Sequence, residues 1–217
     1  MPTPLIPVKR LADGKRRLGP ALNPVFRRLL VIAMFEDVVA ALQATPGLER
    51  PVVVTPDREM WQRAEAIGCR VVEEPPGTGE DLNASLTRVV GHGEWPGGVL
   101  VVAADLPLAT PEDFARVTDA MAEHAVVVVP SRDGDGTNVL GWRDPVSFAP
   151  AYGPGSAGRH LGAADAVRVE AEGLGMDADT PSDLRAILPA LGPASVTGRR
   201  ARDLKLAGLL ETDQGSR

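Results

Sequence analysis

The chain has 217 residues, a mass of 22.8 kDa and 44% hydrophobic residues, which is the size and composition of one globular domain. Its 29 acidic residues outnumber its 23 basic residues, and the net charge of −6 argues against nucleic acid as a partner. A single cysteine, Cys69, and apolar runs no longer than residues 29–35 predict a cytoplasmic protein with no internal disulfide and no membrane partner.

Short apolar segments alternate with helical segments along the first 130 residues. Strands are expected at residues 4–8, 51–55, 70–73, 99–103 and 125–129. The helices expected between them begin at Asn23–Pro24 and run towards Gly47, then cover 57–67 and about 82–90, and begin again at Thr110–Pro111. A polar loop is expected at 74–80. Strands that are nearly all apolar and separated by helices predict an α/β fold with a mostly parallel sheet covered on both faces.

The alternation changes after Pro130. A Gly-rich loop covers 131–138, and a weaker strand at 139–142 is expected to run antiparallel. A short helix follows from Ser156 through His160, then a strand at 166–170, and Thr180 caps what we expect to be the final helix. The sequence thus predicts one domain over residues 1–192 and a C-terminal extension of unknown order at 193–217.

Three aspartates fall where a metal site is expected. Asp105 ends a strand, and Asp177 and Asp179, in an extended Asp-x-Asp, point to the same side. Hard carboxylate oxygens suit Mg²⁺, and we expect at least two of the three to bind it. The alternative is that these aspartates only cap helices, because both Asp-Leu-Pro and Asp-Thr-Pro often begin one.

Two of the three lysines lie in one seven-residue window after the first strand. Lys9 and Lys15 could neutralise a triphosphate there, although a solvated surface loop is the commoner fate of such residues. The segment carries neither a P-loop nor a Gly-x-Gly-x-x-Gly motif, which excludes the first and weakens a dinucleotide-cofactor site.

Two Gly-containing loops could bind a small phosphorylated acceptor. Residues 134–138 offer backbone donors and the Thr137 hydroxyl, and Gly153, Gly155 and Ser156 precede a helix. The alternative is an ordinary loop between strands. His160 draws notice only because it follows Ser156 by one helical turn.

Taken together, these segments resemble the guanylyltransferases of coenzyme F420 biosynthesis, which join GTP to a small phosphorylated three-carbon acid and release pyrophosphate. The matching segments are residues 5–11, 15–18, 81–83, 105–107, 134–140, 152–160 and 177–184. The resemblance implies a single-domain nucleotidyltransferase fold of the nucleotide-diphospho-sugar transferase type. Phosphoenolpyruvate is the expected acceptor, and 2-phospho-L-lactate and 3-phosphoglycerate stay open.

The resemblance also implies a role for each matching residue. Lys9, Lys15 and Asp105 would be catalytic, with both lysines on the GTP phosphates, and Leu82 and Asn83 would lie by the guanine. Asp105, Asp177 and Asp179 would hold Mg²⁺. The acceptor would sit on Thr137, Gly153 and Ser156.

The next enzyme of the coenzyme F420 pathway is one candidate protein partner. Two other functions stay open: a nucleotidyltransferase that acts on a sugar or alditol phosphate, and a relative that binds a nucleotide without turnover.

Overall fold

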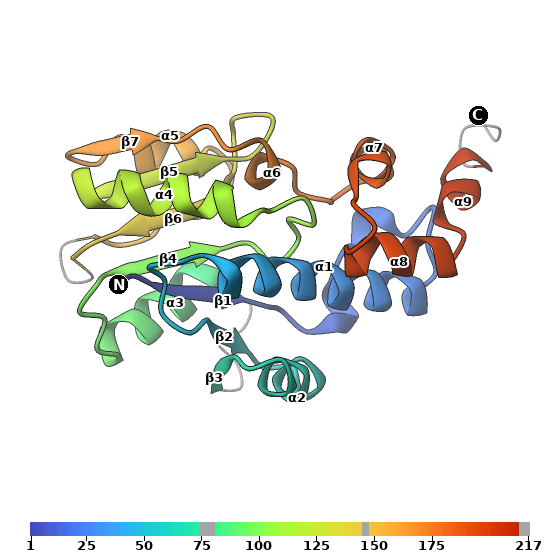
Figure 1. Cartoon of the computed structure of the whole chain (residues 1–217), viewed down its shortest axis with the longest axis horizontal. Helices are drawn as coiled ribbons and strands as arrows, with labels where there is room; N and C mark the ends of the chain where they lie inside the picture. Colours follow the sequence, from blue (N-terminus) through green and yellow to red (C-terminus); the bar gives the residue numbers. More distant parts are fainter. Residues whose placement is uncertain (74–80, 145–147, 213–217) are drawn as a thin grey trace.

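The computed structural model describes residues 1–73, 81–144 and 148–212, and within them seven strands form one mixed sheet (Figure 1). The polar loop expected at 74–80 lies outside the described residues. The strands are β1 (Thr3–Pro7), β2 (Val52–Thr55), β3 (Arg70–Glu73), β4 (Val99–Val102), β5 (Val126–Pro130), β6 (Thr137–Trp142) and β7 (Ala166–Arg168). Every strand expected from the sequence is present, with ends that differ by one or two residues at most.

The strand order is β3-β2-β1-β4-β6-β5-β7. β1 pairs in parallel with β2 on one side and β4 on the other, so the chain reverses its direction of travel across the sheet between these strands. β6 is antiparallel to both β4 and β5, which confirms the expected antiparallel element. In such sheets ligands bind beyond the carboxyl ends of the strands at the reversal point, which here is the edge formed by β1 and β4.

Several helices begin where the sequence places caps. The described helices are α1 (Pro24–Ala44), α2 (Arg58–Ala66), α3 (Leu82–His92), α4 (Pro111–Glu123), α5 (Ser156–Leu161), α6 (Glu172–Gly175), α7 (Pro181–Ile187), α8 (Val196–Asp203) and α9 (Leu206–Thr212). The Asn23 side chain accepts the N–H of Phe26 and so caps α1. Thr110 and Thr180 each form a capping box with the aspartate three residues further on. The aspartates at 113 and 183 therefore cap helices.

Alternate strand residues feed two apolar clusters, one on each face of the sheet. Ile6 and its neighbours in β2 and β4 pack against α1 and α4, where Phe35 and Phe114 are fully buried. Leu5 and Val101 face the other way, into a cluster with Leu86 of α3. Burial on both faces explains why the central strands are nearly all apolar. Cys69 is buried in the first cluster, as a small core residue.

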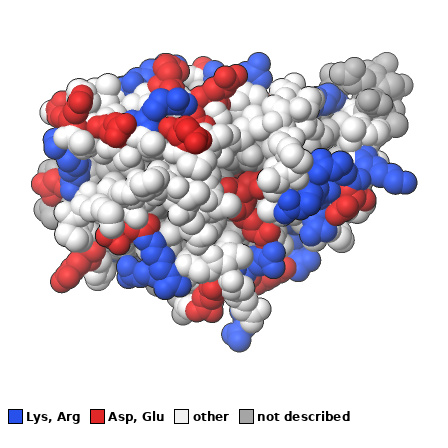
Figure 2. Space-filling view, in the orientation of Figure 1, with Lys and Arg blue, Asp and Glu red and all other residues white. Residues whose placement is uncertain are grey.

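The C-terminal segment is helical and packs against α1, so the expectation that α7 is the final helix is wrong. α8 lies alongside α1 (Figure 1), and the Asp37 carboxylate of α1 accepts the N–H groups of Val196 and Thr197 and the Ser195 hydroxyl. Figure 2 shows Lys and Arg side chains gathered over this end of the molecule, whereas both signs mix over the rest of that face. No helix among residues 1–73, 81–144 and 148–212 is long and apolar enough to cross a membrane.

Candidate active site

A cleft of about 550 Å³ lies at the carboxyl ends of β1 and β4. The loop after β1 contributes Lys9 and Lys15 to its wall, the loop after β4 contributes Asp105, and Thr137 at the start of β6 lies on the wall as well. Residues that are far apart in the sequence therefore meet at the edge that the topology selects. The larger apolar hollow beside Trp95 contains none of these charged groups.

The loop after β1 holds Lys15 in an unusual backbone conformation. The loop is fixed by the N–H of Val8 on the carbonyl of Val54 and by the N–H of Leu11 on the Asp57 carboxylate. Lys15 lies between two 3-10 turns, η1 (Leu11–Asp13) and η2 (Arg16–Leu18), with a φ of 52°. A positive φ costs free energy in a residue other than glycine, so this placement of the side chain is supported by its contacts.

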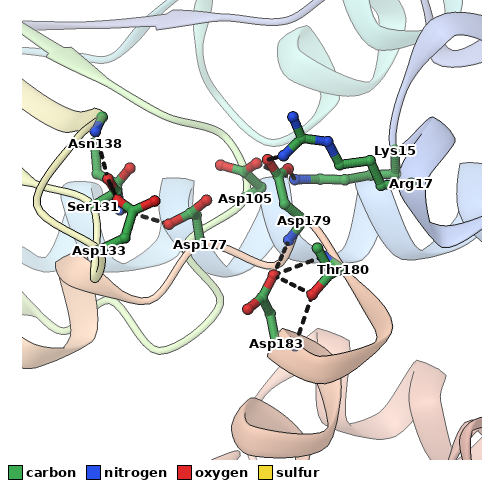
Figure 3. A network of polar contacts seen from close by, with 11 residues as sticks. Lys15, Arg17, Asp105, Ser131, Asp133, Asn138, Asp177, Asp179, Thr180 and Asp183 are labelled. Atoms are coloured by element: carbon green, nitrogen blue, oxygen red, sulfur yellow. Dashed lines mark hydrogen bonds and ion pairs between the residues drawn. The ribbon is translucent and has the colours of Figure 1, made fainter. Parts of the chain in front are cut away.

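Those contacts are two carboxylates. The Lys15 ammonium lies against Asp105, and its Nζ is 2.6 Å from Asp179 Oδ1 (Figure 3). Burial by itself would lower the pKa of Lys15, but the two carboxylates outweigh it, and the net pKa lies above its ordinary value. Arg17, which is largely exposed, adds a more distant ion pair with Asp179 at 3.9 Å. Lys9 is exposed on the same wall, and the described residues give it no ion pair.

The Asp-x-Asp segment lies against the end of β4. The N–H of Ala178 donates to the carbonyl of Asp105 at 3.1 Å, and the Ala178 side chain is fully buried. Asp177 and Asp179 therefore point away from the core, on the side expected from an extended backbone. Asn138 of β6 holds Asp177 by a hydrogen bond from Nδ2 to Oδ1 of 3.2 Å.

The carboxylates repel one another. Burial, then the charge of Asp105 and, more weakly, that of Asp179 raise the pKa of Asp177 above its ordinary value. A cation would relieve this excess of negative charge, and the oxygen donors are of the kind that Mg²⁺ prefers. As they stand, the described residues contain no group of three or more His, Cys, Asp or Glu that could hold a metal ion. Lys15 acts as the counter-ion for Asp105 and Asp179, so binding of a metal ion by these carboxylates stays a prediction.

Asn83 is hydrogen-bonded to the backbone of the 151–156 loop. Its Oδ1 accepts the N–H of Tyr152 at 2.7 Å and its Nδ2 donates to the carbonyl of Tyr152 at 3.1 Å. These bonds use one lone pair and one N–H of the amide, which leaves one of each, and the place of Asn83 by the guanine stays a prediction. Leu82 and Tyr152 do line the cleft.

Two sets of contacts describe the loops expected to bind the acceptor. Asp133 accepts the Ser131 hydroxyl and the N–H of Asp135, so one backbone donor of the expected anion nest at 134–138 is engaged with a carboxylate of the chain itself. Ser156 is 1% exposed, and its hydroxyl donates to Thr137 Oγ1 at 3.1 Å. Thr137 reaches the cleft. Gly153 is exposed, with a φ of 123° that favours glycine.

Two residues with clear positions in the site were not assigned roles from the sequence. Asn138 donates to the carbonyl of Leu174 at 2.9 Å as well as to Asp177. His160 is 1% exposed and hydrogen-bonded at both ring nitrogens. The signal for both was their place in matching segments: Asn138 follows Thr137 directly, and His160 closes the helical turn that Ser156 opens.

Known proteins are similar to this chain over most of its length. Residues 3–192 match the protein family described as "Guanylyl transferase CofC like". A phosphoenolpyruvate guanylyltransferase of Nocardia farcinica is 39% identical over 206 residues, 92% of this chain and 90% of the relative. One of Rubrobacter xylanophilus is 38% identical over 205 residues, 91% and 98% of the two chains.

Solved structures support the fold. A crystal structure of a nucleotide-diphospho-sugar transferase, so described for Desulfovibrio desulfuricans, superposes with a TM-score of 0.72 at 16% identity and covers 98% of this chain and 99% of its own. At this identity the likeness concerns the fold alone. The fold class predicted from the sequence, an α/β nucleotidyltransferase of the nucleotide-diphospho-sugar transferase type, is confirmed.

Proposed function

From the membership of this chain in the family of CofC-like guanylyl transferases, we propose that it transfers GMP from GTP to phosphoenolpyruvate in coenzyme F420 biosynthesis. Pyrophosphate is the second product. The family and the enzyme class predicted from the sequence are both confirmed by the match. The acceptor named for the relatives supports phosphoenolpyruvate, with 2-phospho-L-lactate and 3-phosphoglycerate as the close alternatives.

The observation that carries this proposal is the pairing of cations and carboxylates across one cleft. Lys9 and Lys15 lie in the loop that follows β1, Asp105 follows β4, and Asp179 lies just before α7. A nucleoside triphosphate needs positive charge along its phosphates and a place for its cation, and this cleft offers residues for both. Leu82 provides an apolar contact for the base.

Asp177, with Asp105 and Asp179, would hold a divalent cation, and Mg²⁺ is our proposal for its identity. When bound, the ion would supply positive charge to the triphosphate and to the leaving pyrophosphate. The residues fit because they are hard oxygen donors with an excess of negative charge, which the raised pKa of Asp177 reflects. Lys15 would then be free to turn from the carboxylates to the phosphates.

The reaction needs no covalent enzyme intermediate. An anionic oxygen of the acceptor phosphate attacks the α-phosphorus of GTP in line, and the bond from that phosphorus to the β-phosphate bridging oxygen breaks. The main obstacle is repulsion between two anions. Lys9 and Lys15 reduce it by neutralising charge, and Thr137 and Gly153 are proposed to fix the acceptor in the attacking position, with Ser156 supporting Thr137 through its hydroxyl.

The decisive experiment measures pyrophosphate release by the purified chain with Mg²⁺ and GTP and one acceptor at a time. The acceptors are phosphoenolpyruvate, 2-phospho-L-lactate, 3-phosphoglycerate and a sugar 1-phosphate, and each assay is repeated with ATP. We expect the highest kcat/KM with GTP and phosphoenolpyruvate. An Asp105→Asn preparation made in parallel shows that the activity belongs to this chain.

Three results would contradict the proposal in different ways. Release with the sugar 1-phosphate alone would indicate the sugar-phosphate transferase alternative. GTP binding without release for any acid would indicate the binding-only alternative. Equal efficiency with ATP would overturn the choice of guanine as the base. The cytoplasmic location and the next pathway enzyme as partner stay predictions.

A further inference from the structure

A buried chain of hydrogen bonds runs from the 151–156 loop to the wall of the cleft. The N–H of Ala151 donates to Nε2 of His160 at 2.9 Å, and Nδ1 of His160 lies 2.9 Å from Oγ1 of Thr137. The Ser156 hydroxyl donates to the same Thr137 oxygen at 3.1 Å. His160 and Ser156 are both 1% exposed, whereas Thr137 reaches the cleft.

The backbone bond decides which nitrogen of His160 carries the proton. A neutral imidazole has one N–H, and its other nitrogen can only accept. Because Nε2 accepts from Ala151, the proton must be on Nδ1, and Nδ1 must donate to Thr137. The ring is neutral near pH 7, since burial, with a contribution from the charge of Arg159, lowers the pKa of His160 to about 4.

The hydrogen bonds of the Thr137 hydroxyl can be assigned in the same way. A hydroxyl oxygen has two lone pairs and one proton. His160 and Ser156 donate to that oxygen, so both lone pairs are used and only the proton is left. Thr137 lines the cleft, and the described residues offer this proton no acceptor.

We propose that His160 is a positioning residue that keeps the Thr137 hydroxyl as a pure hydrogen-bond donor towards the cleft, where it selects an ionised oxygen of the acceptor substrate. This inference rests on the proposed function, because it assigns a partner to the acceptor that the reaction requires. A carboxylate or phosphate oxygen satisfies the donor. An ammonium group, or a hydroxyl that must donate, finds no lone pair on Thr137 and is rejected.

The surroundings hold the imidazole in this role. The ring of Tyr152 packs edge-on against His160 with centroids 5.2 Å apart, and Phe148 lies at 6.0 Å. Arg159 anchors the loop from the other side by donating to the carbonyl of Ala151 at 2.9 Å. Ala151 is thus held at both its N–H and its carbonyl, so the donor that fixes the tautomer is itself fixed.

Two substitutions at His160 test the roles of its two ring nitrogens separately. His160→Asn places an amide donor near the position of Nδ1 and abandons Ala151, whereas His160→Gln can place its carbonyl near Nε2 and abandons Thr137. We expect His160→Gln to raise the KM for the acceptor about tenfold, with little change in kcat or in the KM for GTP. His160→Asn should recover much of the loss. His124→Gln, at an exposed histidine that pairs with Asp165, is the matched control and should leave all constants unchanged.

A readout without substrate tests the tautomer directly. In ¹⁵N-labelled protein near pH 7, we expect His160 to show a protonated Nδ1 and an unprotonated Nε2, assigned by its loss in His160→Gln and its retention in His124→Gln. Thr137→Val should leave the tautomer intact and raise the acceptor KM. Thr137→Ser should keep a low KM.

The outcomes distinguish this inference from the proposed function. If the wild-type chain turns over phosphoenolpyruvate but His160 carries its proton on Nε2, the inference is wrong and the function stands. Equal acceptor KM values in wild type and His160→Gln would also overturn the inference. If no acid is turned over at all, the proposed function fails, while the tautomer measurement still decides the hydrogen-bond assignment.

Discussion

Lys15→Met should make the chain bind divalent cations more tightly while it lowers guanylyl transfer. The substitution keeps an unbranched side chain of similar length and removes the ammonium group. In the structure this ammonium is the counter-ion of both Asp105 and Asp179. A metal ion that approaches these carboxylates has to displace it. The variant removes the competitor, so the same carboxylates become available without that cost.

The size of the effect follows from the contacts that are lost. A hydrogen bond to a charged group contributes about 1.5–3 kcal/mol. The side chains of Asp105 and Asp179 are 24% and 42% exposed, so solvent screening places the net cost of displacing Lys15 near the lower limit, about 1.5 kcal/mol. Since about 1.4 kcal/mol corresponds to a factor of ten, the dissociation constant for Mn²⁺ should fall about tenfold. Turnover should fall as well, because a cation for the triphosphate is gone.

The assay is titration calorimetry with Mn²⁺ in the absence of nucleotide, and two variants serve as controls. Arg17→Met removes an equal charge that lies 3.9 Å from Asp179 and is well exposed, so its effect should be much smaller. Lys9→Met removes a cation from the same wall that has no carboxylate partner in the described residues. Unchanged or weaker Mn²⁺ binding by Lys15→Met, with both controls unchanged, would refute the competition between Lys15 and a metal ion.

Three further predictions concern activity and stability. Asp105→Asn or Asp179→Asn should lower turnover at least about a hundredfold, and near-wild-type rates across a Mg²⁺ titration would remove both from the metal site. Tyr152→Phe should raise the unfolding free energy by up to about 1 kcal/mol in urea titrations, because the buried Tyr152 hydroxyl has no partner in the described part of the chain. A loss of stability in this variant would show that the hydroxyl does have a hydrogen-bond partner. Asp37→Ala should cost about 2 kcal/mol by detaching α8, whereas Asp119→Ala, on the exposed face of α4, should not.

The strands and helices could be predicted because their determinants are local. β1, β2 and β4 are nearly all apolar since each is buried on both faces, and the caps at Asn23, Thr110 and Thr180 mark helix starts within a few residues of sequence. The convergence of Lys15, Asp105 and Asp179 followed from the rule that strand ends share one edge of the sheet. The C-terminal helix α8 was missed because its partner is α1, and the hydrogen bond from Ser195 to Asp37 joins residues 158 apart in the chain.

The hydrogen-bond partners of polar side chains could not be predicted. Asn83 and Tyr152 are 69 residues apart, and nothing in the sequence around Asn83 indicates that its side-chain amide is hydrogen-bonded to the backbone of Tyr152. Ser131 and Asp133, in contrast, are two residues apart, yet the sequence of the loop does not decide whether its donors face a substrate or their own carboxylate. Residue type and spacing identify the groups that a site contains, while packing decides which of them are still unpaired.

A third apolar cluster, beside the two on the faces of the sheet, contacts both the segment that carries Lys15 and the segment that carries Asp177 and Asp179. Leu18, three residues after Lys15, and Ala178, between the two aspartates, are buried together in it with Ala201, Leu206 and Leu210 of the C-terminal segment. The two segments that carry the charged groups therefore pack on the same apolar cluster. Residues beyond 192, where the family match ends, complete that cluster. A chain shortened at 192 would keep every charged group of the cleft. It would lose the apolar packing of Ala201, Leu206 and Leu210, which holds Lys15 and Asp179 at their spacing.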